Sequence, residues 1–140
     1  IMYVIGDERD LIGRRANHRR DAVYLYPLRF EREVVTSLLT DMLLRANNLH
    51  ENPEFYNTVT NTCTTNVADH LNVVRPDVMP WDSSMVFPGY SDAYFHELAL
   101  IDTMLPAEEI RAHFRINDRS ETCMDSADFS ACIRDFPALP

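Results

Sequence analysis

The sequence contains no lysine, and all 13 of its basic side chains are arginines. This absence excludes a Walker A phosphate loop, a Schiff-base lysine and a Ser-x-x-Lys nucleophile. Glycine occurs only at Gly6, Gly13 and Gly89, so the chain has neither a dinucleotide fingerprint nor a glycine-rich phosphate cradle. No run of roughly 18 apolar residues is present and no signal peptide is visible, so the sequence predicts no transmembrane helix.

The chain has 140 residues, 46% of them hydrophobic, which predicts a single globular domain over residues 1–140. Its net charge of −9 argues against nucleic acid as a partner, because phosphate binding needs a basic surface. The chain starts at Ile1, within a short apolar run typical of a strand. We therefore expect it to be the C-terminal part of a larger domain.

Two short runs rich in β-forming residues, 2–5 and 22–26, predict strands. Apolar residues at helical spacing predict a helix over 31–49 with one buried stripe, made of Val34, Val35, Leu38, Leu39, Met42, Leu43, Ala46 and Leu49. A second helix is expected over 63–74, capped by Thr62 or Asn61, and shorter ones over 92–100, 107–114 and 126–134. The sequence thus predicts an α+β fold, in which missing upstream strands would complete a small antiparallel sheet packed on helices.

Cys63 is the first candidate for chemistry, because it lies at the expected start of the helix over 63–74. Backbone N–H groups at a helix N-terminus stabilise a thiolate, which a nucleophilic cysteine requires. A lone cysteine is also commonly a small buried apolar residue. Cys123 and Cys132 either form a disulfide in an oxidising compartment, which leaves Cys63 as the odd thiol, or remain two surface thiols.

A nucleophilic cysteine needs a base, usually a histidine. His70 follows Cys63 by two helical turns, about 10 Å along the axis, and is therefore poorly placed to contact it. The other histidines carry no spacing argument. His96-Glu97 lacks the second histidine of a zinc helix and there is no Cys-x-x-Cys pair, so we expect no metal site and no cofactor.

A basic cluster lies near the N-terminus and contains Arg14, Arg15, His18, Arg19 and Arg20. One interpretation is a solvated surface loop. The other is a site for a phosphate or carboxylate head group, since arginine binds such groups in a bidentate manner.

Several segments together resemble the N-terminal periplasmic domain of the Lnb-type lipoprotein N-acyltransferase family. They are residues 3–10 (YVIGDERD), 23–28 (VYLYPL), 53–57 (PEFYN), 61–66 (NTCTTN), 88–92 (PGYSD), 98–102 (LALID) and 128–130 (DFS). The block around Cys63 is the most specific of them. The family usually has asparagine directly before the cysteine, whereas here Thr62 occupies that place and Asn61 precedes it. The upstream glycine-histidine segment of the family is also absent.

The resemblance implies a circularly permuted papain-like, NlpC-like fold with its catalytic histidine before residue 1. It further implies a periplasmic location, close to a membrane through parts outside this chain. Cys63 would form a thioester with a lipid acyl chain and pass it to a lipoprotein amine. The loop around the cysteine would be supported by Tyr56, Asn57, Asn61 and Asn66, and a lipid head group would contact Arg14, Arg15, Arg19 and Arg20.

Two other functions remain open at this stage. A cysteine amidase or peptidase of the cell wall would use a similar helix-borne thiol, but in a polar, charged cleft. A non-catalytic periplasmic binding or scaffold domain would use Cys63 only structurally. The apolar aromatic segment from Met79 through Trp81 to Tyr90 favours an acyltransferase, which should present an apolar groove, although core packing explains these side chains equally well.

Overall fold

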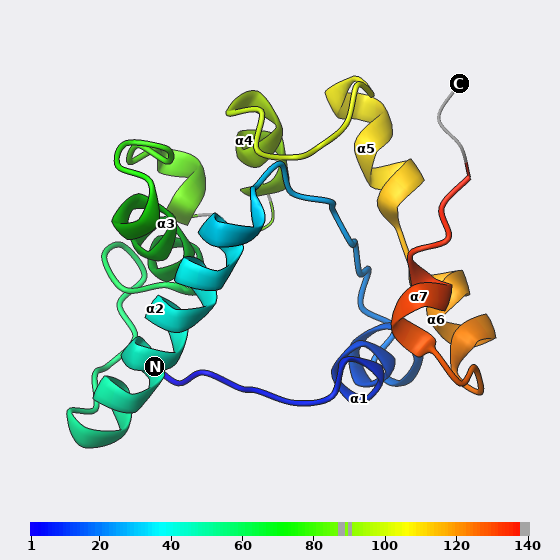
Figure 1. Cartoon of the computed structure of the whole chain (residues 1–140), viewed down its shortest axis with the longest axis horizontal. Coiled ribbons are helices and arrows are strands. Elements are labelled where there is room, and N and C mark those ends of the chain that lie inside the picture. Colours follow the sequence, from blue (N-terminus) through cyan, green and yellow to red (C-terminus); the bar gives the residue numbers. More distant parts are fainter. Residues whose placement is uncertain (87–88, 90, 138–140) are drawn as a thin grey trace. The chain divides into compact units, whose positions relative to one another are not determined.

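The computed structural model describes residues 1–86, 89 and 91–137 (Figure 1). The chain divides into two compact units, each made of two stretches of sequence. The first unit comprises Ile1–Tyr3 and Leu28–Asp102, and the second comprises Val4–Pro27 and Thr103–Pro140. The single domain expected over residues 1–140 stays a prediction.

The first unit contains α2 (Arg32–Glu51), α3 (Cys63–Val74), the 3-10 helix η2 (Ser83–Val86) and α4 (Ser91–Glu97). The second contains α1 (Glu8–Gly13), the π-helix η1 (Arg14–His18), α5 (Ala107–Phe114), α6 (Asn117–Cys123) and α7 (Phe129–Ile133). The helices expected over 63–74 and 107–114 are confirmed with their bounds, and the long helix is confirmed with small shifts at its ends. Those expected over 92–100 and 126–134 are shorter in the structure.

The predicted small antiparallel sheet is wrong for the described residues, which are 55% helical and form no strand. Their β pairing is limited to three isolated antiparallel bridges, Tyr24–Arg115, Leu28–Ile101 and Asn57–Asn61. A strand needs a neighbouring strand over several residues, so that its backbone N–H and C=O groups are hydrogen-bonded. The run over 22–26 has such a neighbour only around Tyr24, and Met2, Val4 and Ile5 in the other run are largely exposed. The sheet of the expected papain-like fold is therefore absent from the described chain.

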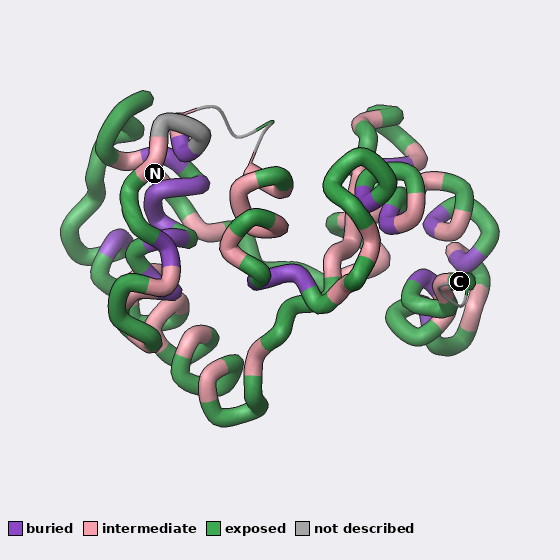
Figure 2. The backbone as a smooth tube through the Cα atoms, turned by 90° about the horizontal axis from the view of Figure 1, so that it is seen from above, coloured by how far each residue is buried: buried purple, intermediate pink, exposed green. Residues whose placement is uncertain are grey.

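The core of the first unit lies between α3 and the segment that follows it. It consists of Ala68, Leu71, Met79, Met85 and Leu100. Leu38 of α2 packs against this core, but the expected stripe of α2 is covered only in part. Leu49 is its one buried member among the described residues, whereas Val35, Leu39 and Leu43 are exposed. Figure 2 shows the buried residues as short stretches of the chain, separated by exposed and intermediate ones.

The core of the second unit is a small cluster made of Ile116, Cys123, Phe129 and Ile133. A disulfide between Cys123 and Cys132, with 5.8 Å between the Cα atoms, joins α6 to α7 inside this cluster. The side chain of Asp128 caps α7 by accepting from the Ala131 amide at 2.9 Å. Packing, covalent linkage and capping therefore hold together two helices that are each shorter than two and a half turns.

Candidate functional site

Cys63 occupies the first position of α3, and its side chain is a free, exposed thiol. Thr62 caps the helix: its Oγ1 accepts from the Thr65 amide at 3.0 Å, and the Thr65 hydroxyl accepts from the Thr62 amide at 2.8 Å. This reciprocal pair is a capping box, and Thr62 is almost completely buried. The cap fixes the direction of the first turn and therefore the position from which Cys63 projects.

The turn before Cys63 is held by asparagines. Asn57 Oδ1 accepts from the amides of Val59 and Thr60 at 2.9 and 3.0 Å, and Asn57 and Asn61 form a two-residue bridge. Asn66, from the first turn of α3, donates to Asn61 Oδ1 at 2.7 Å and to the Thr62 carbonyl at 2.8 Å. Three of the four residues expected to support the cysteine loop therefore bond within it.

Tyr56, the fourth expected supporting residue, is exposed. The loop is also tied to α2 through an ion pair. Arg45 of α2 donates both terminal nitrogens to the carboxylate of Glu54, at 2.7 Å each. Asn61 donates to the same carboxylate at 3.1 Å, and the Arg45 guanidinium holds the pKa of Glu54 below its ordinary value.

His70 lies two turns further along α3 and is buried between two partners. Its Nδ1 is 2.6 Å from Asp41 Oδ2 on α2, and its Nε2 is hydrogen-bonded to the hydroxyl of Tyr3. A carboxylate only accepts hydrogen bonds, so Nδ1 carries the proton that faces Asp41, and in the neutral imidazole Nε2 then accepts from Tyr3. Burial raises the pKa of Tyr3, which keeps its hydroxyl protonated as a donor.

The Tyr3–His70–Asp41 arrangement was not expected from the sequence. His70 was identified only as a residue poorly placed to contact Cys63, and the described contacts of its imidazole are indeed with Tyr3 and Asp41. These partners are 67 and 29 residues away in sequence. No local spacing marks such a pair, so the only available signal was a histidine on a helix with an aspartate in the neighbouring helix.

Two of the pockets beside α3 in the described chain concern the site. One lies between α2 and α3 beside His70, and it is lined by Asp41, Leu44, Arg45, Asn48, Asn66, Asp69, His70 and Val73. The other is mostly apolar and is lined by Val59, Thr60, Thr65, Ala68, Asp69, Asn72, Met79, Trp81 and Met85. At about 100° per residue, its α3 residues lie roughly 140–240° around the helix from Cys63. The apolar pocket therefore faces away from the thiol.

Residues 79–81 of the expected aromatic segment are fixed to the first unit. Asn72 of α3 bonds both the amide and the carbonyl of Met79, at 2.9 and 2.8 Å, and Tyr94 donates to the Pro80 carbonyl at 2.6 Å. Phe87 and Tyr90 of that segment, and Pro88 of the family-like motif over 88–92, lie outside the described residues.

The basic cluster of the second unit surrounds Asp21. Arg15 and Arg19 each contact its carboxylate at 3.2 Å, while Arg14 starts the π-helix and Arg20 has a left-handed backbone with φ 62°. Two of the four arginines are thus already paired with a carboxylate. Their contact with a lipid head group stays a prediction.

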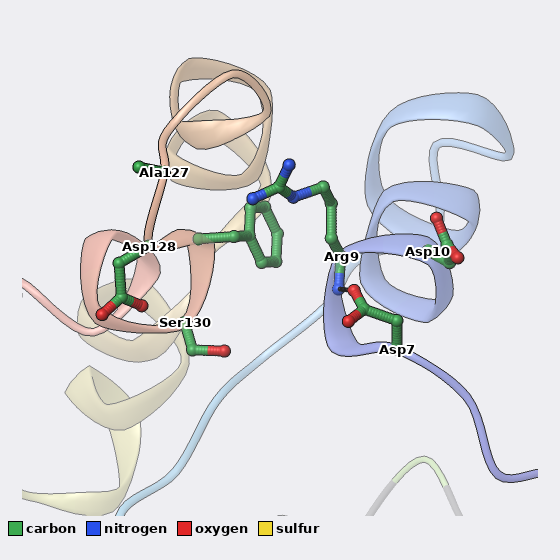
Figure 3. A pocket seen from close by; sticks show the side chains of 7 residues that line it. Asp7, Arg9, Asp10, Ala127, Asp128 and Ser130 are labelled. Atoms are coloured by element: carbon green, nitrogen blue, oxygen red, sulfur yellow. Dashed lines mark hydrogen bonds between the residues drawn. The ribbon is translucent and has the colours of Figure 1, made fainter.

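A polar pocket of the second unit lies between α1 and the start of α7 (Figure 3). Several of its side chains already have structural partners. Asp7 and Asp128 cap α1 and α7, and Arg9 donates to the Ser126 carbonyl at 2.7 Å while its guanidinium lies over the Phe129 ring. The pocket contains no cysteine or histidine among its lining residues, so we assign no chemistry to it.

Cys63 is the free cysteine of the chain, because Cys123 and Cys132 are bonded to each other. Within residues 1–86, 89 and 91–137, no three histidine, cysteine or acidic side chains are grouped so that they could hold a metal ion. None of the helices in this part of the chain is both long and apolar enough to cross a membrane.

Comparison with known proteins gives one family. Residues 1–112 match the model of the Lnb N-terminal periplasmic domain, which confirms the resemblance based on the segments around Cys63. The matched range includes the whole first unit, whereas α6, α7 and their disulfide lie beyond it. No curated protein and no solved structure matches the chain. The chain belongs to the Lnb N-terminal periplasmic domain family and is therefore a periplasmic domain.

Proposed function

We propose that this domain is a cysteine-dependent acyltransferase that acts on lipids or lipoproteins in the periplasm, with Cys63 as its nucleophile. One observation carries the proposal: Cys63 is a free, exposed thiol on the first turn of a capped helix, while the other two cysteines form a disulfide. An oxidising compartment that keeps Cys123 and Cys132 paired leaves Cys63 as the thiol available for chemistry.

The reaction has two steps. The Cys63 thiolate adds to the carbonyl carbon of a lipid ester, the bond from this carbon to the alkoxy oxygen breaks, and the lipid alcohol leaves with a proton. The acyl group is then a thioester on Cys63. The amine of the acceptor attacks this thioester and loses a proton, the carbon–sulfur bond breaks, and an amide and the free thiol result.

The first turn of α3 supplies donors for the oxyanion of each step. The Thr65 amide is bonded to the Thr62 hydroxyl and the Asn66 amide to the Thr62 carbonyl. The backbone N–H groups of Cys63 and Thr64 take no part in these capping hydrogen bonds. They are adjacent to Sγ and directed out of the helix end, where an oxyanion would be stabilised.

His70 is not assigned as the base of this reaction. Its two ring nitrogens are bonded to Asp41 and Tyr3, and the described contact of the Cys63 thiol is with Thr64 Oγ1 at 3.9 Å. The proposed reaction needs a general base to deprotonate the thiol. This base is not among the groups that are hydrogen-bonded to Cys63 in the described chain.

The test is an acyl-transfer assay with a phospholipid as donor and an N-terminal lipopeptide amine as acceptor. We expect the amide product to form with the wild-type protein and to be absent with Cys63→Ala and Cys63→Ser. Met104→Ser changes an exposed side chain of the second unit and serves as the active control. Hydrolysis of a cell-wall peptide by the wild type, without acyl transfer, would instead favour the amidase.

A further inference from the structure

The apolar pocket beside α3 plays no part in the reaction proposed for Cys63, because it faces away from the thiol. Its volume of about 360 Å³ suits a small organic molecule. Among its lining residues, Met79 and Met85 are almost completely buried. The segment of Met79 is fixed to α3, because Asn72 bonds both its amide and its carbonyl. The pocket is therefore part of the packed structure of the first unit.

Trp81 is the aromatic residue among the described residues that line this pocket. It is 68% exposed, so its ring is accessible to a ligand. Its backbone neighbour is also fixed, because the Pro80 carbonyl accepts from the Tyr94 hydroxyl at 2.6 Å. Of the aromatic side chains, tryptophan attracts cations most strongly through the face of its ring. The pocket thus combines apolar walls with a group that favours positive charge.

Asp69 carries the charge of the pocket. It is exposed, and within the described part of the chain its carboxylate has no hydrogen bond and no ion pair. Arg45 lies within electrostatic range of Asp69, but both of its terminal nitrogens are bonded to Glu54. The Asp69 carboxylate is therefore available to balance a positive charge on a ligand.

A second acidic residue acts close to Trp81. Asp82 follows it in the chain, and its charge adds to burial in raising the pKa of Tyr94, the residue bonded to the Pro80 carbonyl. No basic side chain is found among the described residues that line the pocket. A cavity bordered by charges of one sign concentrates ligands of the opposite sign. The pocket is thus suited to a cation and disfavours an anion.

We propose that this apolar pocket binds a quaternary ammonium group, with its methyl groups against Trp81 and its charge balanced by Asp69. Two other polar side chains of the pocket are already used: the Asn72 amide is bonded to Met79, and the Thr65 hydroxyl belongs to the cap of α3. A primary ammonium group has three N–H donors that need acceptors. A quaternary one has none, so apolar contact, an aromatic face and a counter-charge are sufficient to bind it.

The emission of Trp81, the only tryptophan of the chain, reports binding directly. The 140-residue protein is titrated with choline and with its neutral isostere dimethylbutanol, in which a carbon atom replaces the nitrogen. We expect a saturable change with choline and binding at least about tenfold weaker for the isostere, which has the same shape but no charge. Phosphocholine distinguishes the source of the group: binding as tight as that of choline indicates a lipid head group, and weaker binding indicates a free cation.

Variants of the two central residues are compared through the NMR signal of the choline methyl groups, which does not require the tryptophan. Trp81→Leu keeps an apolar wall and should bind choline about fivefold more weakly. Asp69→Asn should bind it about threefold more weakly, because an exposed ion pair contributes little, and should leave the isostere unaffected. Asp125→Asn removes an exposed acidic residue of the second unit and is the matched control.

The inference predicts that Asp125→Asn and Cys63→Ala bind choline as the wild type does, and circular dichroism should show that all variants keep the fold. Equal binding of choline and its isostere, a change in emission that does not saturate, or equal effects of Asp69→Asn and Asp125→Asn would overturn it. Choline binding without acyl transfer contradicts only the proposed function, since the pocket does not include the thiol.

Discussion

Nδ1 of His70 lies 2.6 Å from Oδ2 of Asp41, and this contact joins α3 to α2 inside the first unit. Nε2 of the same imidazole bonds the hydroxyl of Tyr3. One side chain thus connects three stretches of chain: the N-terminal segment, the long helix and the helix that carries Cys63. Because His70 is 96% buried, neither partner is easily replaced by water.

Replacing His70 should therefore destabilise the first unit. His70→Ala leaves a carboxylate and a hydroxyl without their partner, and we expect a loss of about 1–3 kcal/mol in the free energy of unfolding. Tyr3→Phe removes the hydroxyl that bonds His70 and donates to Asn66 Oδ1 at 3.5 Å, but leaves the contact between His70 and Asp41, and should have a smaller effect. Urea titration at pH 7 measures both. His50→Ala, on the exposed end of α2, is the control, and an equal effect of the two histidine variants would contradict this role of His70.

The cap of α3 gives a second prediction. Thr62→Ala removes the hydroxyl that accepts from the Thr65 amide and should lower stability by about 1 kcal/mol. Thr62→Ser keeps this acceptor and should retain most of the stability. Thermal unfolding of the two variants measures the difference, and equal losses would show that the methyl group of Thr62, rather than its hydroxyl, stabilises the turn.

The disulfide gives a third prediction. Cys123 and Cys132 are nine residues apart, and opening such a loop should cost about 2–3 kcal/mol of stability by the loop-entropy relation. The double variant Cys123→Ala/Cys132→Ala should exchange its α6 and α7 amide hydrogens faster than the wild type. Cys63→Ala is the matched control because that side chain is free and exposed. Unchanged exchange in the double variant would contradict a stabilising role of the bond.

The fourth prediction concerns pH. Glu8 of α1 accepts from Arg134 at 2.6 and 2.9 Å, and these bonds hold the pKa of Glu8 below its ordinary value of 4.5. A carboxyl whose pKa is lowered by folding adds stability above pH 4.5, and this stability is lost as the pH falls through the folded pKa. Since the Arg134 side chain is about half exposed, the contribution should not exceed about 1 kcal/mol.

Unfolding of Glu8→Gln and Arg134→Gln, measured from pH 6 to pH 3, tests this pair. Both variants should be less stable than the wild type at pH 6. Glu8→Gln should approach it at pH 3, because protonation removes the same interaction, whereas Arg134→Gln also loses its bond to the Ser130 carbonyl and should keep that part of the difference. A constant difference across this range would assign the effect of the substitutions to packing rather than to charge.

The helices were predictable where the sequence carries a period or a cap. Cys63–Val74 follows from the spacing of Val67, Leu71 and Val74, a capping threonine and a following proline. The helix α6 was missed, because Asn117–Cys123 has no apolar period and depends on its contacts with Phe129 and Ile133. The strands were wrong because β propensity describes a fit to neighbouring strands, and the run over 22–26 pairs only around Tyr24.

The same distinction holds for the candidate site, where local features could be predicted from the sequence and contacts between helices could not. Cys63 and its cap are neighbours in sequence and were identified from residue types and spacing, whereas the asparagines of its turn were expected from the family resemblance. The contact between His70 and Asp41 depends on the packing of α3 on α2, and no local pattern encodes it. The exposure of Phe55 was equally out of reach, because the sequence alone does not show that the core leaves this ring uncovered.

The most direct test of the central claim is the mass of the protein after incubation with a phospholipid in the absence of an acceptor amine. We predict an increase equal to one acyl chain, located on the peptide that contains Cys63, removed by neutral hydroxylamine and absent in Cys63→Ser. An acyl chain on another residue, or an unchanged mass under conditions in which transfer to an acceptor is observed, would contradict the assignment of Cys63 as the nucleophile.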